Sequence, residues 1–486
     1  MSAPNQSKLR IDASALIRAG FTLIVLAFFV KFVGPGLNYG FNGDDAGNIY
    51  YHWTRFRELL INLPLFFTTY CRPMGGLYFA TLYLLFGVDP LPYHIVTTVL
   101  LALNTFLAFR FARLITGSEL IGGITAILMV YHVQMIELVY LPAYIFDVLC
   151  FTFYVLAANY YLGIRSRGST LKPKQVAVLM LLYIGALESK EIGATLPVIL
   201  LLYELIYNPP LRTRAGLTKW IRHEALSALI AGVITAVYIV GKLTGAEALT
   251  HNEAYKLTLT WERYWDSTRR FVNNILYCRI EDGFFTPASI VILALALLLY
   301  AVWRRKEKYQ LLMWCYLWIA PLPITFVPGR SGGMLYIPLL GWAVLAAGAF
   351  VLICSTVSKA LARVRIPPKP ATAVLVLAGI TAYWITLDRK DWWVPKWAAN
   401  STGPMTRAFA EVKAVCPKVK RGAKIYVYNS PPGSWDTKFV MELVYGDRTT
   451  NVWLDVHAPL SQSEIDAMDY VFTFEDGRLK LLRGAS

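Results

Sequence analysis

The chain has 486 residues, of which 56% are hydrophobic and only 16% are charged. A soluble globular protein neither buries nor tolerates so much apolar surface, so the composition excludes that class and indicates an integral membrane protein. The formal net charge of +16 does not indicate binding to nucleic acid, because the lysines and arginines form short clusters between apolar runs instead of one basic domain.

The apolar runs are long enough to cross a hydrocarbon core about 30 Å thick, which takes about 20 helical residues. We predict eleven spans, at about residues 14–34, 91–114, 119–138, 142–163, 175–190, 192–208, 225–245, 287–303, 310–327, 334–355 and 371–387. The first run has no small-residue cleavage site and is predicted to be an anchoring span. The predicted fold class is therefore an α-helical polytopic membrane protein with about eleven transmembrane helices.

The basic clusters predict the orientation of these spans. They fall at residues 8–10, 110–113, 165–174, 212–222, 304–308 and 359–369. All lie on one side of the predicted membrane, which places the N-terminus in the cytoplasm and the C-terminus outside. The absence of a retrieval signal and of a lumenal tail rich in glycosylation sites favours a bacterial inner membrane, with a periplasmic C-terminus, over an endoplasmic reticulum.

Two external loops are too long to be simple connections. In the loop of residues 35–90, apolar residues recur at helical spacing over 49–67, which predicts an amphipathic helix flat on the membrane. A short hydrophobic helix at 75–86, half-inserted or horizontal, follows it. The second loop, 246–286, mixes aromatic and charged residues.

The composition changes after the last span. We predict one domain, residues 1–388, in the membrane and a small extracytoplasmic α/β domain over residues 389–486. Short apolar runs at 424–428, 451–456 and 470–474 are typical of strands in that domain.

Candidate catalytic and binding residues lie at the outward-facing ends of predicted spans. They are Asp44, Asp45 and Arg72 in the first external loop, Asp147 near the start of the fourth span, Glu188, Lys190 and Glu191 between the fifth and sixth spans, and Arg330 between the ninth and tenth. Charge at membrane depth is costly, so these side chains are expected to face a polar cavity. If the bundle closes, they converge on one outward-facing cavity suited to an anionic, lipid-linked substrate.

Each candidate also has a purely structural interpretation. Asp44 and Asp147 could cap helices, and Lys190 could form an internal ion pair with its flanking glutamates. Arg330 could contact lipid headgroups. His94 could be a satisfied structural histidine.

The order of these parts resembles the GT-C superfamily of membrane glycosyltransferases over residues 10–390. The resemblance lies in Gly43-Asp44-Asp45-Ala46, Arg72-Pro73, the segment from Phe86-Gly87 through Pro90 to His94, Asp147, and Ser189-Lys190-Glu191. Within the superfamily the chain is most similar to protein O-mannosyltransferases, to TPR-bearing transmembrane O-mannosyltransferases and to bacterial aminoarabinose transferases that modify lipid A. It departs from the TPR-bearing group at Gly329, where that group has a glutamate, and its tail differs from a MIR domain.

The resemblance implies an inverting transfer of one sugar from a polyprenyl-phosphate donor to an acceptor hydroxyl at the outer face of the membrane. Asp44 would be the general base, and Asp45 and Asp147 would orient hydroxyl groups or share a divalent cation, Mg²⁺ or Mn²⁺, with Asp44. Arg72, Lys190 and Arg330 would hold the donor phosphate, with Glu188, Glu191 and His94 as accessory substrate-site residues. The chain has no glycine-rich nucleotide loop, so no nucleotide is expected.

Two other classes remain open from the sequence. A lipid or sugar transporter or flippase usually has two related halves with broken midplane helices, and we detect no such halves. A ligase that transfers whole oligosaccharides from a polyprenyl lipid typically uses arginines and a late histidine, whereas the acids here come early. A non-catalytic scaffold is a further alternative. The sequence does not select among a protein, lipid or polysaccharide acceptor.

Overall fold

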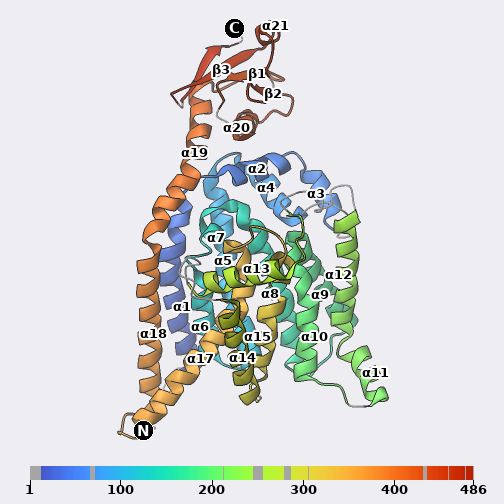
Figure 1. Ribbon diagram of the computed structural model, residues 1–486, viewed down its shortest axis with the longest axis vertical. Helices are drawn as coiled ribbons and strands as arrows, with labels where there is room; N and C mark the ends of the chain where they lie inside the picture. Colours follow the sequence, from blue (N-terminus) through green and yellow to red (C-terminus); the bar gives the residue numbers. More distant parts are fainter. Residues whose placement is uncertain are drawn as a thin grey trace, which may run out of the picture.

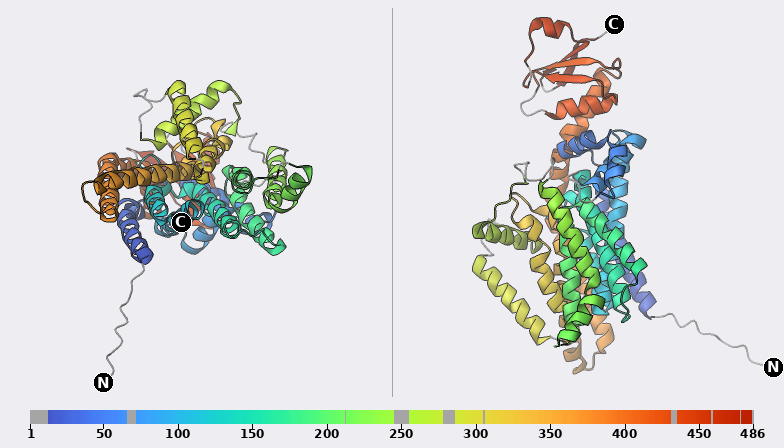
Figure 2. Two further views of the ribbon diagram at one scale, coloured as in Figure 1. Left: turned by 90° about the horizontal axis from the view of Figure 1, so that it is seen from below. Right: turned by 90° about the vertical axis from the view of Figure 1, so that its right-hand side faces the viewer.

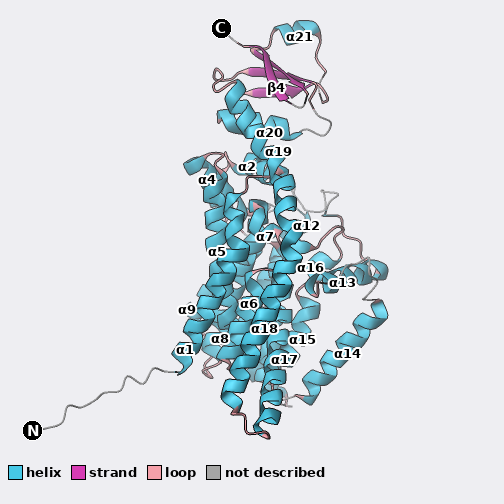
Figure 3. Cartoon of the chain, turned by 90° about the vertical axis from the view of Figure 1, so that its left-hand side faces the viewer, coloured by secondary structure: helices cyan, strands magenta, loops and turns pink. Residues whose placement is uncertain are grey.

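Long helices form a bundle, and a small sheet domain lies beyond one end of it (Figure 1). The computed structural model describes residues 13–65, 72–211, 213–244, 255–277, 286–304, 306–430, 435–457, 459–476 and 478–484. The strands all belong to the terminal domain (Figure 3). Helices α13 and α14 lie on the flank of the bundle opposite α1 (Figure 2).

Every predicted span overlaps a helix. The helices are α1 (Ala13–Phe28), α5 (Pro90–Thr116), α6 (Glu119–Val130), α8 (Ile145–Arg165), α9 (Pro173–Ser189), α10 (Leu196–Tyr207), α12 (Leu226–Thr244), α14 (Pro287–Trp303), α15 (Lys308–Ile319), α17 (Tyr336–Ala362) and α18 (Pro368–Lys390). Short helical segments between them are η1 (Phe29–Val33), η2 (Gly34–Asn38), α7 (Glu137–Tyr140), η3 (Pro142–Tyr144), η4 (Glu191–Thr195), α11 (Arg214–His223), α13 (Trp261–Ile275), α16 (Leu322–Thr325) and η7 (Gly332–Leu335).

Within the described residues, six helical segments are long and apolar enough to cross a membrane. They are Arg18–Asn38, Pro90–Thr116, Pro142–Arg165, Leu226–Thr244, Gly332–Ala362 and Pro368–Val415. The polytopic helical class is confirmed, and the full count of about eleven spans stays a prediction. The remaining helices are shorter than a span usually requires.

Helix α8 occupies the centre of the bundle, and 83% of its apolar stretch is buried. It packs between α5 and α9. Asn104 of α5 donates a hydrogen bond to the Val148 carbonyl at 3.0 Å and accepts one from Thr152 at 2.7 Å. A Cβ atom at Gly185 of α9 would lie 2.8 Å from the Phe153 ring, so this glycine permits close approach of α8 and α9.

The loop predicted to be the first external one forms α2 (Gly43–His52), α3 (Phe56–Asn62) and α4 (Pro73–Phe86). The prediction of one helix over 49–67 is wrong, because the helix starts earlier and breaks between α2 and α3. Tertiary packing overrides the periodicity there, since His52 of α2 and Leu59 of α3 both pack on Gly76 of α4. The short helix predicted at 75–86 is confirmed as α4.

A nearly continuous helical segment leads into the terminal domain. Helix α18 passes through η8 (Asp391–Trp393) into α19 (Val394–Val415), so the predicted domain boundary at 388 lies in the last turns of α18. The remaining elements are β1 (Lys424–Tyr428), α20 (Trp435–Tyr445), β2 (Asn451–Leu454), α21 (Gln462–Asp466), β3 (Tyr470–Glu475) and β4 (Arg478–Arg483). The sheet order is β2-β1-β3-β4, with β4 antiparallel to β3 and the other pairs parallel. The three predicted strands are confirmed, and β4 was not predicted.

The terminal domain rests on α2 and α4 through α20. The Tyr50 hydroxyl of α2 donates to Glu442 at 2.6 Å, and the Tyr50 and Phe439 rings stack with centroids 4.4 Å apart. The Tyr83 hydroxyl of α4 donates to the Leu443 carbonyl at 2.8 Å. The surface of α2 therefore faces the terminal domain.

Candidate functional site

A pocket of about 240 Å³ gathers charged residues from several junctions between helices. Its charged lining residues are Arg72, Lys190, Glu191, Lys242 and Arg330. The other lining residues are mostly apolar or aromatic: Ala194, Tyr238, Ile239, Leu243, Tyr255, Leu257, Pro323, Ile324, Val327 and Met334. The expectation that Arg72, Lys190 and Arg330 share one cavity agrees with this lining.

Arg72 enters the pocket from the residue before α4. Its backbone is left-handed, with φ 52° and ψ 56°, which is uncommon for a residue other than glycine and is often found at functional sites. The Arg72 guanidinium donates two hydrogen bonds to the Glu191 carboxylate, at 2.9 and 2.7 Å. Burial acts to raise the pKa of Glu191, but Arg72 outweighs it and lowers the pKa to about 2. Glu191 is therefore ionised and holds Arg72 in place.

Lys190 forms a buried ion pair with Asp147. The Lys190 ammonium lies 2.7 and 2.6 Å from the two carboxylate oxygens of Asp147, and the side chains are 7% and 5% exposed. Asp147 lies in the first turn of α8, where it does not cap the helix. Lys190 therefore forms an internal ion pair, as its structural interpretation expects, but the partner is Asp147 and not a flanking glutamate.

Arg330 and Arg72 lie against the same aromatic ring. The guanidinium carbons of Arg330 and Arg72 are 4.3 and 5.3 Å from the centroid of the Tyr255 ring. Such cation–π contacts favour a fixed position of both cations. Tyr255 was not singled out from the sequence, because nothing in its local pattern marks it.

Lys242 is a second pocket residue that sequence reasoning missed. It is buried near the end of α12 and lies 5.2 Å from the Tyr238 ring centroid. A lone lysine inside an apolar span was the available signal. Glu188, which is 1% exposed, interacts electrostatically with Lys242 and does not line the pocket.

The two adjacent aspartates of α2 have different environments. Asp45 is fully buried, and its carboxylate accepts backbone N–H groups from Asn42 at 2.8 Å and from Ala143 at 2.5 Å. Burial, together with the neighbouring Asp44, outweighs these hydrogen bonds and raises the pKa of Asp45 to about 8. Asn42 and Asp45 form the capping box of α2, so Asp44 is not the cap.

Asp44 is exposed and lines an open groove. The other lining residues are Asn42, Gly43, Gly47, Asn48, Ser401 and Phe439. The groove therefore lies between α2 and the elements α19 and α20 of the tail. In the described part of the chain, no hydrogen-bond or ion-pair partner engages the Asp44 carboxylate.

Tyr144 lies within electrostatic range of both sets of charges. Its hydroxyl lies close enough to Asp44, Glu137, Asp147 and Arg330 to interact with each of them electrostatically. Neither Tyr144 nor Glu137 was predicted as a site residue.

A glycine pair lets the segment after Arg330 approach this tyrosine. Gly332 has φ +62°, and a Cβ there would lie 2.8 Å from a Glu137 oxygen; a Cβ at Gly333 would lie 2.7 Å from the Tyr144 ring. The Gly333 N–H also donates to Glu137 at 3.2 Å. The Ser-Gly-Gly sequence was the signal for this close approach.

The residues do not fit the expected divalent cation. Asp147 gives both oxygens to Lys190, and Asp45 gives its oxygens to backbone N–H groups. Among the residues that the structure describes, no group of three histidine, cysteine or acidic side chains could hold a metal ion.

His94 does not line the pocket. It lies buried at the start of α5, next to the backbone of Gly40 and Val139. Its Nε2 has no hydrogen-bond partner among the described residues, so His94 is buried but is not the satisfied histidine of the structural alternative.

Comparisons with known proteins show the fold. No family model matches the chain, and no curated protein sequence matches it. The structure is similar to crystal structures of ArnT from Cupriavidus metallidurans. With the form bound to undecaprenyl phosphate, the TM-score is 0.50 at 11% identity over 96% of this chain and 94% of that chain. With the apo form, the TM-score is 0.43 at 12% identity over 90% and 86%. The likeness to the form bound to undecaprenyl phosphate shows that the two chains share a fold.

Proposed function

We propose that the protein is an inverting GT-C glycosyltransferase. It transfers a sugar from a polyprenyl-phosphate donor to an acceptor hydroxyl on the extracytoplasmic side of the membrane. The observation that carries the proposal is the pocket in which Arg72, Lys190 and Arg330 meet an apolar wall. The fold likeness to an ArnT structure bound to undecaprenyl phosphate supports the donor class.

The charge of the pocket suits a phosphate that gains negative charge. Among the residues that the structure describes, four cations (Arg72, Lys190, Lys242 and Arg330) and one carboxylate (Glu191) line the pocket. When the bond between the anomeric carbon and the phosphate oxygen breaks, its electron pair stays on the leaving polyprenyl phosphate. Cations that are already fixed by ion pairs and by Tyr255 stabilise this charge without reorganising.

Asp44 is the general base in this proposal. The oxygens of Asp45 and Asp147 are already engaged, whereas the Asp44 carboxylate opens onto the groove beside α20. An acceptor in that groove loses its hydroxyl proton to Asp44 as its oxygen attacks the anomeric carbon. Such proton transfer contributes about 10² to 10⁴ in rate.

Asp45 and Asp147 are positioning residues. Asp45 fixes α2 to the Ala143 backbone, and Asp147 fixes Lys190. Asp44 therefore lies on a helix that is hydrogen-bonded to the start of α8. The same segment of α8 holds Lys190 of the cationic pocket through Asp147.

The test is sugar transfer by the purified protein in lipid nanodiscs. Radiolabelled polyprenyl-phosphate monosaccharides and a lipid-linked oligosaccharide are offered with native membrane extract as acceptor. We expect wild type to use a monosaccharide donor and Asp44→Asn to lose about 10²-fold or more in rate with donor binding unchanged. Glu58→Gln, which alters an exposed acid of α3, is the matched control and should keep wild-type turnover.

Each contrary result has a definite meaning. Unchanged turnover in Asp44→Asn would remove Asp44 as the base. Transfer of only the oligosaccharide would support the ligase alternative. No transfer from any donor by wild type would overturn the proposal and favour a transporter or scaffold.

A further inference from the structure

A second pocket, of about 440 Å³, lies where α5, α10, α15 and α17 meet. Tyr207 ends α10 and Lys308 begins α15, and both line it. Helix α10 starts next to Glu191 of the candidate active site and rises about 18 Å over its 12 residues. The second pocket is therefore at the opposite end of the bundle, which the basic clusters predict to be cytoplasmic.

The mouth of this pocket is basic. Arg304, Lys306 and Lys308 line it together with a single carboxylate, that of Glu307. Glu307 pairs with Arg304 in its own turn and accepts a hydrogen bond from Gln310 at 3.2 Å. Among the described residues, neither lysine pairs with a carboxylate.

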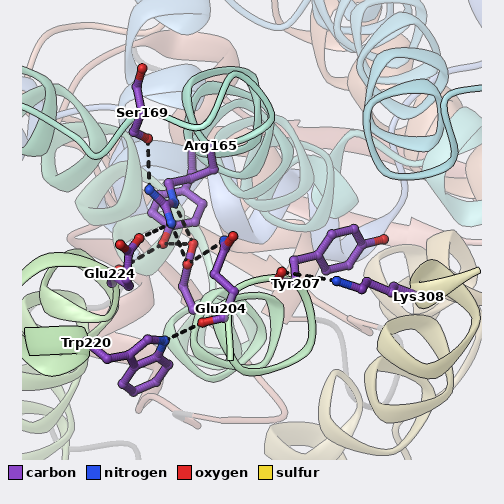
Figure 4. Close-up of polar contacts among 9 residues, drawn as sticks. Arg165, Ser169, Glu204, Tyr207, Trp220, Glu224 and Lys308 are labelled. Atoms are coloured by element: carbon purple, nitrogen blue, oxygen red, sulfur yellow. Dashed lines mark hydrogen bonds and ion pairs between the residues drawn. The ribbon is translucent and has the colours of Figure 1, made fainter. Parts of the chain in front are cut away.

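Lys308 is held in place without being neutralised. Its ammonium donates to the Tyr207 carbonyl at 3.2 Å and lies 5.6 Å from the Tyr207 ring centroid (Figure 4). The Tyr207 hydroxyl in turn donates to the Ile115 carbonyl at 3.1 Å, which ties α10 to α5. Two N–H groups of Lys308 remain for a ligand.

At the same end of the bundle, a neighbouring cluster contains charged side chains that pair with one another. Arg165 donates to Glu204 at 2.8 Å through each of two nitrogens and also pairs with Glu224 (Figure 4). Its remaining donor reaches the Ser169 carbonyl. These charges satisfy one another, whereas the lysines of the second pocket do not.

Part of the wall of the pocket is apolar, because Ile115, Ile121, Val351 and Leu352 line it; Thr116, Tyr309 and Ser355 add polar groups. Cations beside an apolar wall, at a membrane boundary, match an anionic amphiphile, and basic pockets between transmembrane helices are known to take lipid headgroups.

We propose that this pocket binds the phosphate headgroup of an anionic membrane lipid, with part of an acyl chain against the apolar wall between α5 and α17. Lys306 and Lys308 contact the phosphate. The site is separate from the donor pocket, so the proposal does not depend on the glycosyltransferase activity.

The test is native mass spectrometry of the delipidated full-length protein with dioleoyl phosphatidylglycerol, dioleoyl phosphatidylcholine or inorganic phosphate added. We compare wild type with Lys306→Gln/Lys308→Gln. The matched control is Arg167→Gln/Lys174→Gln, which removes two exposed basic residues from the same end outside the pocket. We expect the pocket variant to bind phosphatidylglycerol at least tenfold more weakly, the control to equal wild type, and phosphatidylcholine to be released readily.

Val351→Trp separates the apolar wall from the charge. It should weaken retention of phosphatidylglycerol without changing any charge. Because it leaves both lysines in place, it tests the site even if the lysine variant misfolds. Equal loss in the pocket and control variants would overturn the proposal, because binding would then reflect the general basic surface. Binding of inorganic phosphate as strong as that of phosphatidylglycerol would also overturn it, in favour of a site for soluble phosphate.

Discussion

The ion pair between Asp147 and Lys190 should contribute to stability and to activity in separable ways. At an effective dielectric constant of about 20, two unit charges about 2.7 Å apart attract each other by about 6 kcal/mol, and desolvation offsets much of this. Removing one partner leaves a buried charge alone, which typically costs about 3–5 kcal/mol. We expect Asp147→Asn and Lys190→Met each to lower the free energy of unfolding by about that amount, and the double variant to lose much less than the sum.

Thermal unfolding in detergent, followed with a thiol-reactive dye, measures the stability. Cys150 is a suitable reporter because it is buried beside the Lys190 backbone. The double variant should regain much of its melting temperature but not sugar transfer, because Lys190 lines the pocket. Additive losses in melting temperature would refute the stabilising pair. Full transfer by the double variant would refute a role for Lys190 in binding phosphate.

Three further outcomes test other parts of the site. Burial raises the pKa of Asp45 to about 8, from an ordinary value of about 4. The folded protein thus keeps a proton that the unfolded chain loses, and the contribution of Asp45 to stability falls as pH rises from about 4 to about 8; Asp45→Asn should flatten the melting temperature over that range. Gly333→Val should push against Tyr144 and lower transfer about tenfold or more, whereas Gly232→Ala, which meets no atom within 4 Å, should not. Tyr255→Phe keeps the ring against Arg72 and Arg330 and should keep the donor KM near wild type, whereas Tyr255→Ala should raise it about tenfold; equal effects of the two would exclude the cation–π role.

The sequence predicted the positions of the helices better than the residues at which they end. Apolar runs of about 20 residues have few alternatives to a helix in lipid, and each predicted span overlaps one. The break between α2 and α3 was not predictable, because it depends on packing against Gly76 of α4. Strand β4 was missed since its Arg-Leu-Lys-Leu-Leu-Arg sequence is largely exposed at the sheet edge and lacks an apolar run.

For the site, the sequence predicted which ends of the spans meet but not which side chains pair there. Arg72, Lys190 and Arg330 lie at the junctions predicted to be external, so closure of the bundle brings them together. The pairing of Lys190 with Asp147 depends on the rotation of each helix about its axis, and Tyr255 reaches the pocket from the segment before α13; the sequence gives neither. Asp44 and Asp45 illustrate this limit, because adjacent helical residues point about 100° apart and contact with Ala143 decides which of them is buried.

The start of α8 joins the two halves of the proposed reaction. Within five residues, Ala143 holds Asp45 and with it the helix that carries Asp44, Tyr144 packs against Gly333 beside Arg330, and Asp147 holds Lys190. Because α8 is the most buried of the six candidate spans in the described residues, these attachments are made to a rigid element. Displacement of this segment should therefore disturb both the base Asp44 and the phosphate site. Changes in α20 should affect Asp44 alone, because α20 lines the groove beside it. Glycosyl transfer needs the attacking oxygen and the departing phosphate on opposite sides of one carbon, and a single fixed segment sets that separation.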